Sequence, residues 1–163
     1  MPATPEDLFA RLESLGIPTK TVWHAPVFTV EEAQAARGEM PGVHCKCLFL
    51  RDKKGALWLV AAEENTRIDL KALAARLGAD RFSFASPERL MTHLGVGPGT
   101  VTPFALMNDA DCAVRVALDA AMMAGGVLHF HPLTNAATTR IAAADVLKFI
   151  RACGHEPEIV PLA

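Results

Sequence analysis

Apolar residues recur with helical spacing in several parts of this sequence. Leu8, Leu12 and Leu15 form one such stripe, with Thr4-Pro5 before it and Gly16 after it, which are typical of a helix start and a helix end. The segment from Thr29 to Glu32 has the residues of a capping box, which indicates the start of a second helix. The patterns together predict helices at residues 4–15, from residue 29 onwards, and at residues 69–77, 86–94 and 142–153.

Alternating and continuous apolar runs predict strands between these helices. Residues 43–50 and 56–62 are mostly apolar, and the segment Asp52 to Gly55 between them supplies turn-forming residues, so they predict a hairpin. Since a hairpin is antiparallel, the sheet cannot be entirely parallel. The sequence therefore predicts an α/β fold, in one domain over residues 1–163, with a mixed, mostly antiparallel sheet surrounded by helices. Further strands are predicted at residues 21–23, 104–107, 113–118, 126–130, 137–141 and 158–160.

The amino-acid composition and net charge exclude several classes of protein. The 163 residues are 51% apolar and carry a formal net charge of −2. A protein that coats nucleic acid non-specifically is strongly basic, so any RNA contact here must come from a local patch. The acidic N-terminal segment lacks the features of a signal peptide, and no apolar run reaches the ~20 residues that span a bilayer. We therefore expect a cytoplasmic protein whose four cysteines are free thiols.

Lys46 fits its surroundings less well than any other residue. On a strand it shares a face with His44, Leu48 and Leu50. An ammonium group beside buried leucines is costly unless it is paired, reaches water along its own stem, or lines a wet cavity. Lys46 is thus either a cation that holds a phosphate or carbonyl oxygen in a pocket, or an edge-strand lysine that prevents aggregation.

His129 and His131 flank Phe130 and share one face of a predicted strand. A histidine here could act as an acid, a base or a hydrogen-bond donor, or could simply be a satisfied side chain at a strand end. Cys45 and Cys47 share a face of their own strand, so a Cys2His2 zinc site or a Cys–His catalytic pair is conceivable. The C-x-C and H-x-H spacings are uncommon for zinc, and nothing marks one cysteine as a nucleophile.

Residues 95–103 are rich in glycine and proline and predict neither a helix nor a central strand. The segment Gly97 to Thr100 offers backbone N–H groups without bulky side chains, so a ligand could approach it closely. It matches neither a Walker motif nor a dinucleotide fingerprint. An ordinary turn explains it as well.

Four segments taken together resemble the YbaK/prolyl-tRNA synthetase editing-domain family. They are His24 to Ala33, the lysine-containing strand Cys45 to Leu50, the Gly-x-x-x-Pro element Gly99 to Pro103, and His131 to Thr139. Their order and spacing match across nearly the whole chain. The last segment makes the chain most similar to the free-standing alanyl-tRNA(Pro) deacylases of the ProX type.

This resemblance implies an enzyme that hydrolyses the ester between an amino acid and the terminal ribose of a mischarged tRNA, with Ala-tRNA(Pro) as the expected substrate. It implies no metal, no cofactor and no protein nucleophile. Lys46 would act on the terminal phosphate or position the substrate, and His131, with His129 in reserve, would be the pocket histidine. The residues expected around the aminoacyl group are Phe28, Val30, Leu48, Gly97, Gly99, Thr100, Pro103 and Asn135.

The expected partners are the acceptor end of tRNA(Pro) and prolyl-tRNA synthetase, with neither a membrane nor DNA. Lys20, Arg37, Lys53 and Lys54 are candidate RNA contacts, although solvated surface charge explains each of them equally well. Two alternatives stay open. The chain could be a deacylase for cysteine- or serine-charged tRNA, or a non-catalytic module that binds aminoacyl-tRNA or a synthetase.

Overall fold

The sheet of this protein is built around strand β2 (Val43–Asp52). Its hairpin partner β3 (Leu57–Glu63) runs antiparallel to it. The turn between them forms as the sequence predicts, because Asp52 Oδ1 accepts the backbone N–H groups of Lys54 and Ala56, at 2.9 and 2.8 Å. The computed structural model describes residues 2–26, 29, 31–32, 35 and 41–162.

Eight strands form one mixed sheet, as the sequence predicts. Their order is β1-β7-β6-β2-β3-β5-β8, and β4 also pairs with β2. Four pairings are antiparallel and three are parallel, and the parallel pairings are β6 with β2, β3 with β5 and β5 with β8. The other strands are β1 (Thr19–Trp23), β4 (Phe82–Phe84), β5 (Val114–Asp119), β6 (Val127–Phe130), β7 (Ala137–Ala142) and β8 (Glu158–Val160).

Side-chain caps fix the starts of three of the helices that the sequence predicts, whereas the last of them begins at Ala143 without one. Thr4 and Asp7 form a capping box at the first helix, while Asp69 and Ser86 accept backbone N–H groups at two later helix starts. No helix among the described residues has the length and apolar character needed to cross a bilayer. The helices are α1 (Pro5–Ser14), α3 (Leu70–Leu77), α4 (Pro87–Leu94), the 3-10 helix η1 (Pro103–Asn108), α5 (Ala120–Met123) and α6 (Ala143–Ala152).

The strand predicted at residues 104–107 is wrong, because these residues lie in η1. Pro103 takes the first helical position, where its missing N–H does no harm, and Thr102 Oγ1 accepts the N–H of Phe104 at 3.3 Å. Pro103 to Leu106 are all apolar and buried, so the sequence there has no hydrophobic period that could distinguish a helix from a strand. Strand β4 and helix α5, of 3 and 4 residues, were not predicted.

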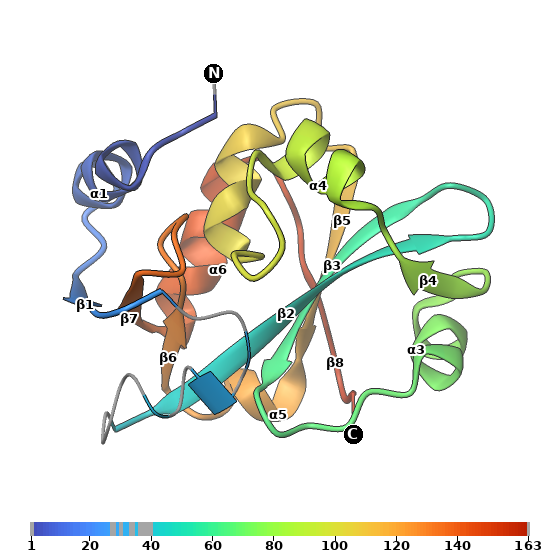
Figure 1. Cartoon of the computed structure of the whole chain (residues 1–163). Coiled ribbons are helices and arrows are strands. Elements are labelled where there is room, and N and C mark those ends of the chain that lie inside the picture. Colours follow the sequence, from blue (N-terminus) through green and yellow to red (C-terminus); the bar gives the residue numbers. More distant parts are fainter. Residues whose placement is uncertain (1, 27–28, 30, 33–34, 36–40, 163) are drawn as a thin grey trace.

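The alternation of side chains along β2 divides the apolar residues into two clusters. Cys45, Cys47 and Phe49 contact the main core, which also contains buried residues of α1, α4, η1 and α6. Leu48 and Leu50 contact a second cluster, built with residues of β3, β4 and α3. Figure 1 shows α4 and α6 on the same side of the sheet, β1, β7 and β6 toward one end of it, and α3 beside β4 at the other end.

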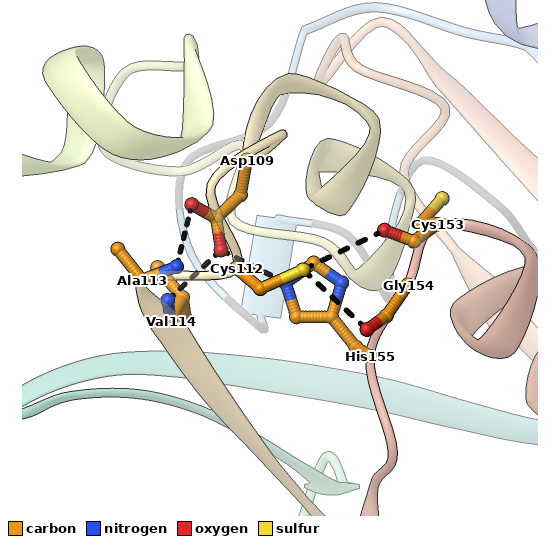
Figure 2. A network of polar contacts seen from close by, with 7 residues as sticks. All are labelled: Asp109, Cys112, Ala113, Val114, Cys153, Gly154 and His155. Atoms are coloured by element: carbon orange, nitrogen blue, oxygen red, sulfur yellow. Dashed lines mark hydrogen bonds and ion pairs between the residues drawn. The ribbon is translucent and has the colours of Figure 1, made fainter.

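A buried polar pair joins the start of β5 to the end of α6 (Figure 2). Asp109 Oδ2 accepts from His155 Nε2 and from Val114 N–H, both at 2.8 Å, while Oδ1 accepts from Ala113 N–H at 3.1 Å. Both side chains of the pair are only 3% exposed. One carboxylate therefore satisfies three donors that have little access to water.

We expect the substitution Asp109→Ala to lower the free energy of unfolding by about 3 kcal/mol or more, because it leaves buried donors without an acceptor. Urea denaturation followed by circular dichroism measures this. Asp111→Ala, at an exposed position two residues away, is the matched control and should change stability by less than about 0.5 kcal/mol. Equal losses for the two variants would contradict this role for Asp109.

Candidate functional site

Lys46 lies on the face of β2 that points away from the main core. Its neighbours Cys45 and Cys47 pack against that core, so alternation directs Lys46 to the side of Leu48. The half-buried Lys46 donates from Nζ to the backbone carbonyl oxygen of Thr66, in the turn after β3. At Lys46, strand β2 pairs with β3 on one edge, while its other edge pairs with β6 only at residues 43–44 and with β4 only at residues 50–52. The alternative of an edge-strand lysine therefore stays open.

A backbone carbonyl, rather than a carboxylate, holds this ammonium group among the described residues. An ammonium has three N–H donors, and the Thr66 carbonyl takes one of them. No described acidic side chain lies within ion-pairing distance of this ammonium group. Lys46 can therefore donate to an anionic or carbonyl oxygen without first breaking an ion pair.

His131 follows directly after β6, on the same face of the sheet as Lys46. Leu128 and Phe130 of β6 belong to the main core, so alternation places His129 and His131 on the other face. Strands β6 and β2 are parallel, with Val43 opposite Leu128 and His44 opposite His129. The pairing ends there, and Lys46 and His131 each follow two residues later on the same face. The fold thus brings these two predicted residues onto one face of neighbouring strands.

The ring of His131 is held in a defined protonation state. Its Nδ1 lies 3.0 Å from the carbonyl oxygen of Ala137, which can only accept, so Nδ1 carries the proton. Burial lowers the pKa of His131 below its ordinary value of 6.5, outweighing that hydrogen bond, and the nearby His24 lowers it further. Around neutral pH the ring is therefore uncharged, and Nε2 offers a lone pair.

His24 and Thr138 extend the same polar face, although neither is among the site residues predicted from the sequence. His24 Nε2 lies 2.8 Å from Thr138 Oγ1, and His24 Nδ1 lies 2.8 Å from the carbonyl oxygen of Ala25. The backbone N–H of His24 continues the pairing of β1 with β7 by donating to Ala136. His24 begins the first of the four family-like segments, but only this long-range pairing brings it toward His131.

His129 is packed into the sheet more tightly than His131. Its ring stacks on that of His44, with centroids 4.2 Å apart and planes at 7°, and its Nε2 lies 2.8 Å from the carbonyl oxygen of Pro41. Gly42 next to Pro41 has φ +118°, and a Cβ there would lie 2.9 Å from His129 Nε2. Only glycine leaves room for this approach. We therefore keep His131 as the first candidate and His129 as the reserve.

The glycine-rich loop belongs to the side of the molecule covered by helices. Val96 is part of the main core, and Val101 packs against it. The backbone turns at Gly99, which has φ +84°, and Thr100 N–H donates to Gly97. Pro103 is buried at the start of η1. None of the described hydrogen bonds joins this loop to Lys46 or His131, so the predicted pocket of Gly97, Gly99, Thr100 and Pro103 facing Lys46 stays a prediction.

The remaining predicted pocket residues fall in different places. Leu48 lies two residues from Lys46 on the same face and packs against the second apolar cluster. Asn135 is half-buried in the turn between β6 and β7. Phe28 and Val30 lie outside the described residues.

The two cysteines beside Lys46 do not converge with the histidines. Cys45 and Cys47 pack against the main core, whereas His129 stacks on His44 on the opposite face, so the Cys2His2 alternative does not fit this geometry. Burial, chiefly, raises the pKa of Cys45 to about 12 and that of Cys47 well above its usual value. Both groups remain neutral thiols at physiological pH, which argues against either as a nucleophile. All four cysteines are free, as expected.

Comparison with known proteins matches this arrangement to one family. The sequence profile of the aminoacyl-tRNA editing domain matches residues 24–149, which hold Lys46, His131 and the glycine-rich loop. This chain belongs to the aminoacyl-tRNA editing domain family. This editing domain is 41% identical over 155 residues to the prolyl-tRNA synthetase associated domain-containing protein 1 of Bos taurus, covering 92% of this chain and 90% of the relative.

Two further relatives cover almost the whole editing domain. The prolyl-tRNA editing protein ProX of Acetoanaerobium sticklandii is 35% identical over 156 residues, with 95% of each chain covered. A crystal structure of a proposed trans-editing enzyme for prolyl-tRNA synthetase has a TM-score of 0.75 and 21% identity, and covers 99% of this chain and 98% of the other. The structural likeness shows a shared fold.

Proposed function

We propose that this editing domain hydrolyses the ester bond of mischarged aminoacyl-tRNA, with alanine on tRNA(Pro) as its preferred substrate. The observation that carries the proposal is the register of β2 and β6, which sets a carbonyl-anchored lysine and a neutral histidine on one face of the sheet. The similarity to a prolyl-tRNA editing protein over 95% of both chains supports the choice of substrate class.

Lys46 is proposed to bind the terminal nucleotide. Its ammonium group is fixed by Thr66 and keeps N–H donors for a phosphate or carbonyl oxygen of the substrate. A fixed donor costs little reorganisation when negative charge develops on that oxygen. Lys46 thus positions the ester and stabilises charge near it, without forming a covalent bond.

His131 is proposed to act through its unprotonated Nε2. This atom can accept a hydrogen bond from the attacking water or from the substrate's ammonium group. Water adds to the ester carbonyl carbon and loses a proton, and the bond to the ribose oxygen breaks. The leaving ribose oxygen takes up that proton, which the vicinal ribose hydroxyl can relay by accepting one proton as it donates another. An aminoacyl ester is already activated, so positioned water and one or two hydrogen bonds are sufficient help.

The energetics of amino acid selection explain why such an activity is needed. A proline-sized pocket cannot exclude alanine firmly, because each lost methylene is worth only about 1–3 kcal/mol. A second site that is too small for proline reverses this selection, since only the smaller amino acid enters and is hydrolysed. The two alternatives are a preference for cysteine- or serine-charged tRNA, and a module that binds without hydrolysis.

A deacylation assay with Ala-, Ser-, Cys- and Pro-tRNA(Pro) tests the proposal. We expect Ala-tRNA(Pro) to be hydrolysed fastest and Pro-tRNA(Pro) to remain intact above the uncatalysed rate. Fastest release of cysteine or serine would overturn the alanine assignment, and no turnover of any substrate would favour the binding module.

Replacing Lys46 with alanine should reduce kcat/KM for the preferred substrate by about 100-fold, because a fixed charged donor to the substrate is lost. Lys53→Ala, in the exposed turn at the other end of the same strand, is the control and should keep full activity. Thermal unfolding should show that both variants remain folded. Unchanged turnover in the Lys46 variant would refute the proposed role.

The rate should also report the protonation of His131. Because burial lowers the pKa of this side chain below 6.5, kcat/KM, after subtraction of the uncatalysed rate, should be level near pH 7 and fall only below pH 6.5. His131→Ala should abolish this acidic limb, whereas His93→Ala, in the last turn of α4, should keep it. An acidic limb that persists in the His131 variant would assign it to another group.

A further inference from the structure

Four basic side chains stand in one row across the sheet, which we name the basic rung. Lys20 of β1 lies opposite Arg140 of β7, Arg140 lies opposite His129 of β6, and His129 lies opposite His44 of β2. Directly opposite residues share a face of the sheet, and the stacked rings of His44 and His129 agree with this. Since His44 also shares its face with Lys46, the basic rung and the candidate site occupy the same face.

The two residues of the basic rung on β1 and β7, Lys20 and Arg140, lower the stability of the fold when nothing is bound. Lys20 and Arg140 are exposed cations directly opposite each other on neighbouring strands, a placement that destabilises a sheet. Neither makes an ion pair with any described acidic side chain. They line a hollow of about 250 Å3, together with residues such as Pro18 and Val127. The charge of this hollow is complementary to an anion.

The charge of the row changes from positive at the β1–β7 end to negative beyond β2. The backbone N–H of Glu64 donates to the carbonyl oxygen of His44 at 2.8 Å, so this glutamate continues the row directly after β3. Positive charge is therefore concentrated at the β1–β7 end and declines toward β3. Three strand spacings, about 14 Å, separate Lys20 from His44. A few nucleotides can cross this distance.

We propose that Lys20 and Arg140 bind backbone phosphates of the tRNA acceptor strand, so that the strand crosses β7 and β6 and delivers its aminoacylated end to Lys46. This inference rests on the proposed function and names the surface that holds its substrate. Arginine and lysine are the side chains suited to phosphate, and a local patch is what a chain of net charge −2 requires to hold RNA. Repulsion between the two cations is relieved when phosphates lie between them.

The lysines of the β2–β3 turn are not part of this surface. Lys53 and Lys54 follow the far end of β2, nine or more residues from His44, which corresponds to about 30 Å along an extended strand. Figure 1 shows this hairpin turn and the β1–β7 edge at opposite ends of the sheet. These two lysines therefore provide a control with the same kind of charge in a different place.

The test measures binding of fluorescently labelled, uncharged tRNA(Pro) by anisotropy at several salt concentrations. The variants are the double substitutions K20E/R140E and K53E/K54E, which change the net charge by the same amount. We expect K20E/R140E to weaken binding at least tenfold and to flatten the salt dependence by about one to two units of slope. The control should stay within twofold of the wild-type protein.

The single variant K20E separates this inference from a loss of folding. It replaces a repulsive cross-strand pair by an attractive one, so its melting temperature should equal or exceed that of the wild-type protein while tRNA binding falls. Binding by K20E/R140E that equals the wild type, or that is lost equally in K53E/K54E, would overturn the inference. Inactivity of the wild-type protein on every charged tRNA would instead overturn the proposed function, and the binding comparison would still decide this inference.

Discussion

The strict alternation of side chains along β2 is the constraint on which the rest of this structure depends. Cys45, Cys47 and Phe49 pack against the main core. Because side chains alternate along a strand, Lys46 must therefore point to the opposite face of the sheet. The same alternation in β6 turns His129 and His131 to that side. A register shift of one residue would exchange the two faces and bury the ammonium group in the main core. The core packing therefore also fixes the position of the candidate chemistry.

The polar face created in this way carries groups that a fold optimised for stability alone would avoid. Lys46 has a carbonyl rather than a carboxylate as its partner, His131 is held neutral by burial, and Lys20 faces Arg140. In the interior, by contrast, the buried carboxylate of Asp109 accepts from three donors. Unfavourable placements concentrated on one face are typical of a binding or catalytic surface rather than of a fold selected for stability alone.

Local signals in the sequence were sufficient for the capped helices, the hairpin and the face on which Lys46 lies. Thr4, Asp69 and Ser86 begin their helices as expected, because a cap and its acceptors lie within a few residues of each other. The strand expected at 104–107 failed because a continuous apolar run has no period, and the cap at Thr102 decided for η1. His24 was missed because its partner Thr138 lies 114 residues away, and no local pattern encodes that pairing.

The distance along the chain between these partners also governs when the candidate site can form. Strand β1 pairs only with β7 among the described strands, and the parallel pairing of β2 with β6 joins residues 43–44 to residues 128–129. During synthesis, Lys46 leaves the ribosome long before the strand that must lie beside it. No N-terminal fragment ending before β6 can hold both Lys46 and His131, so the candidate site stays incomplete until nearly the whole domain has emerged.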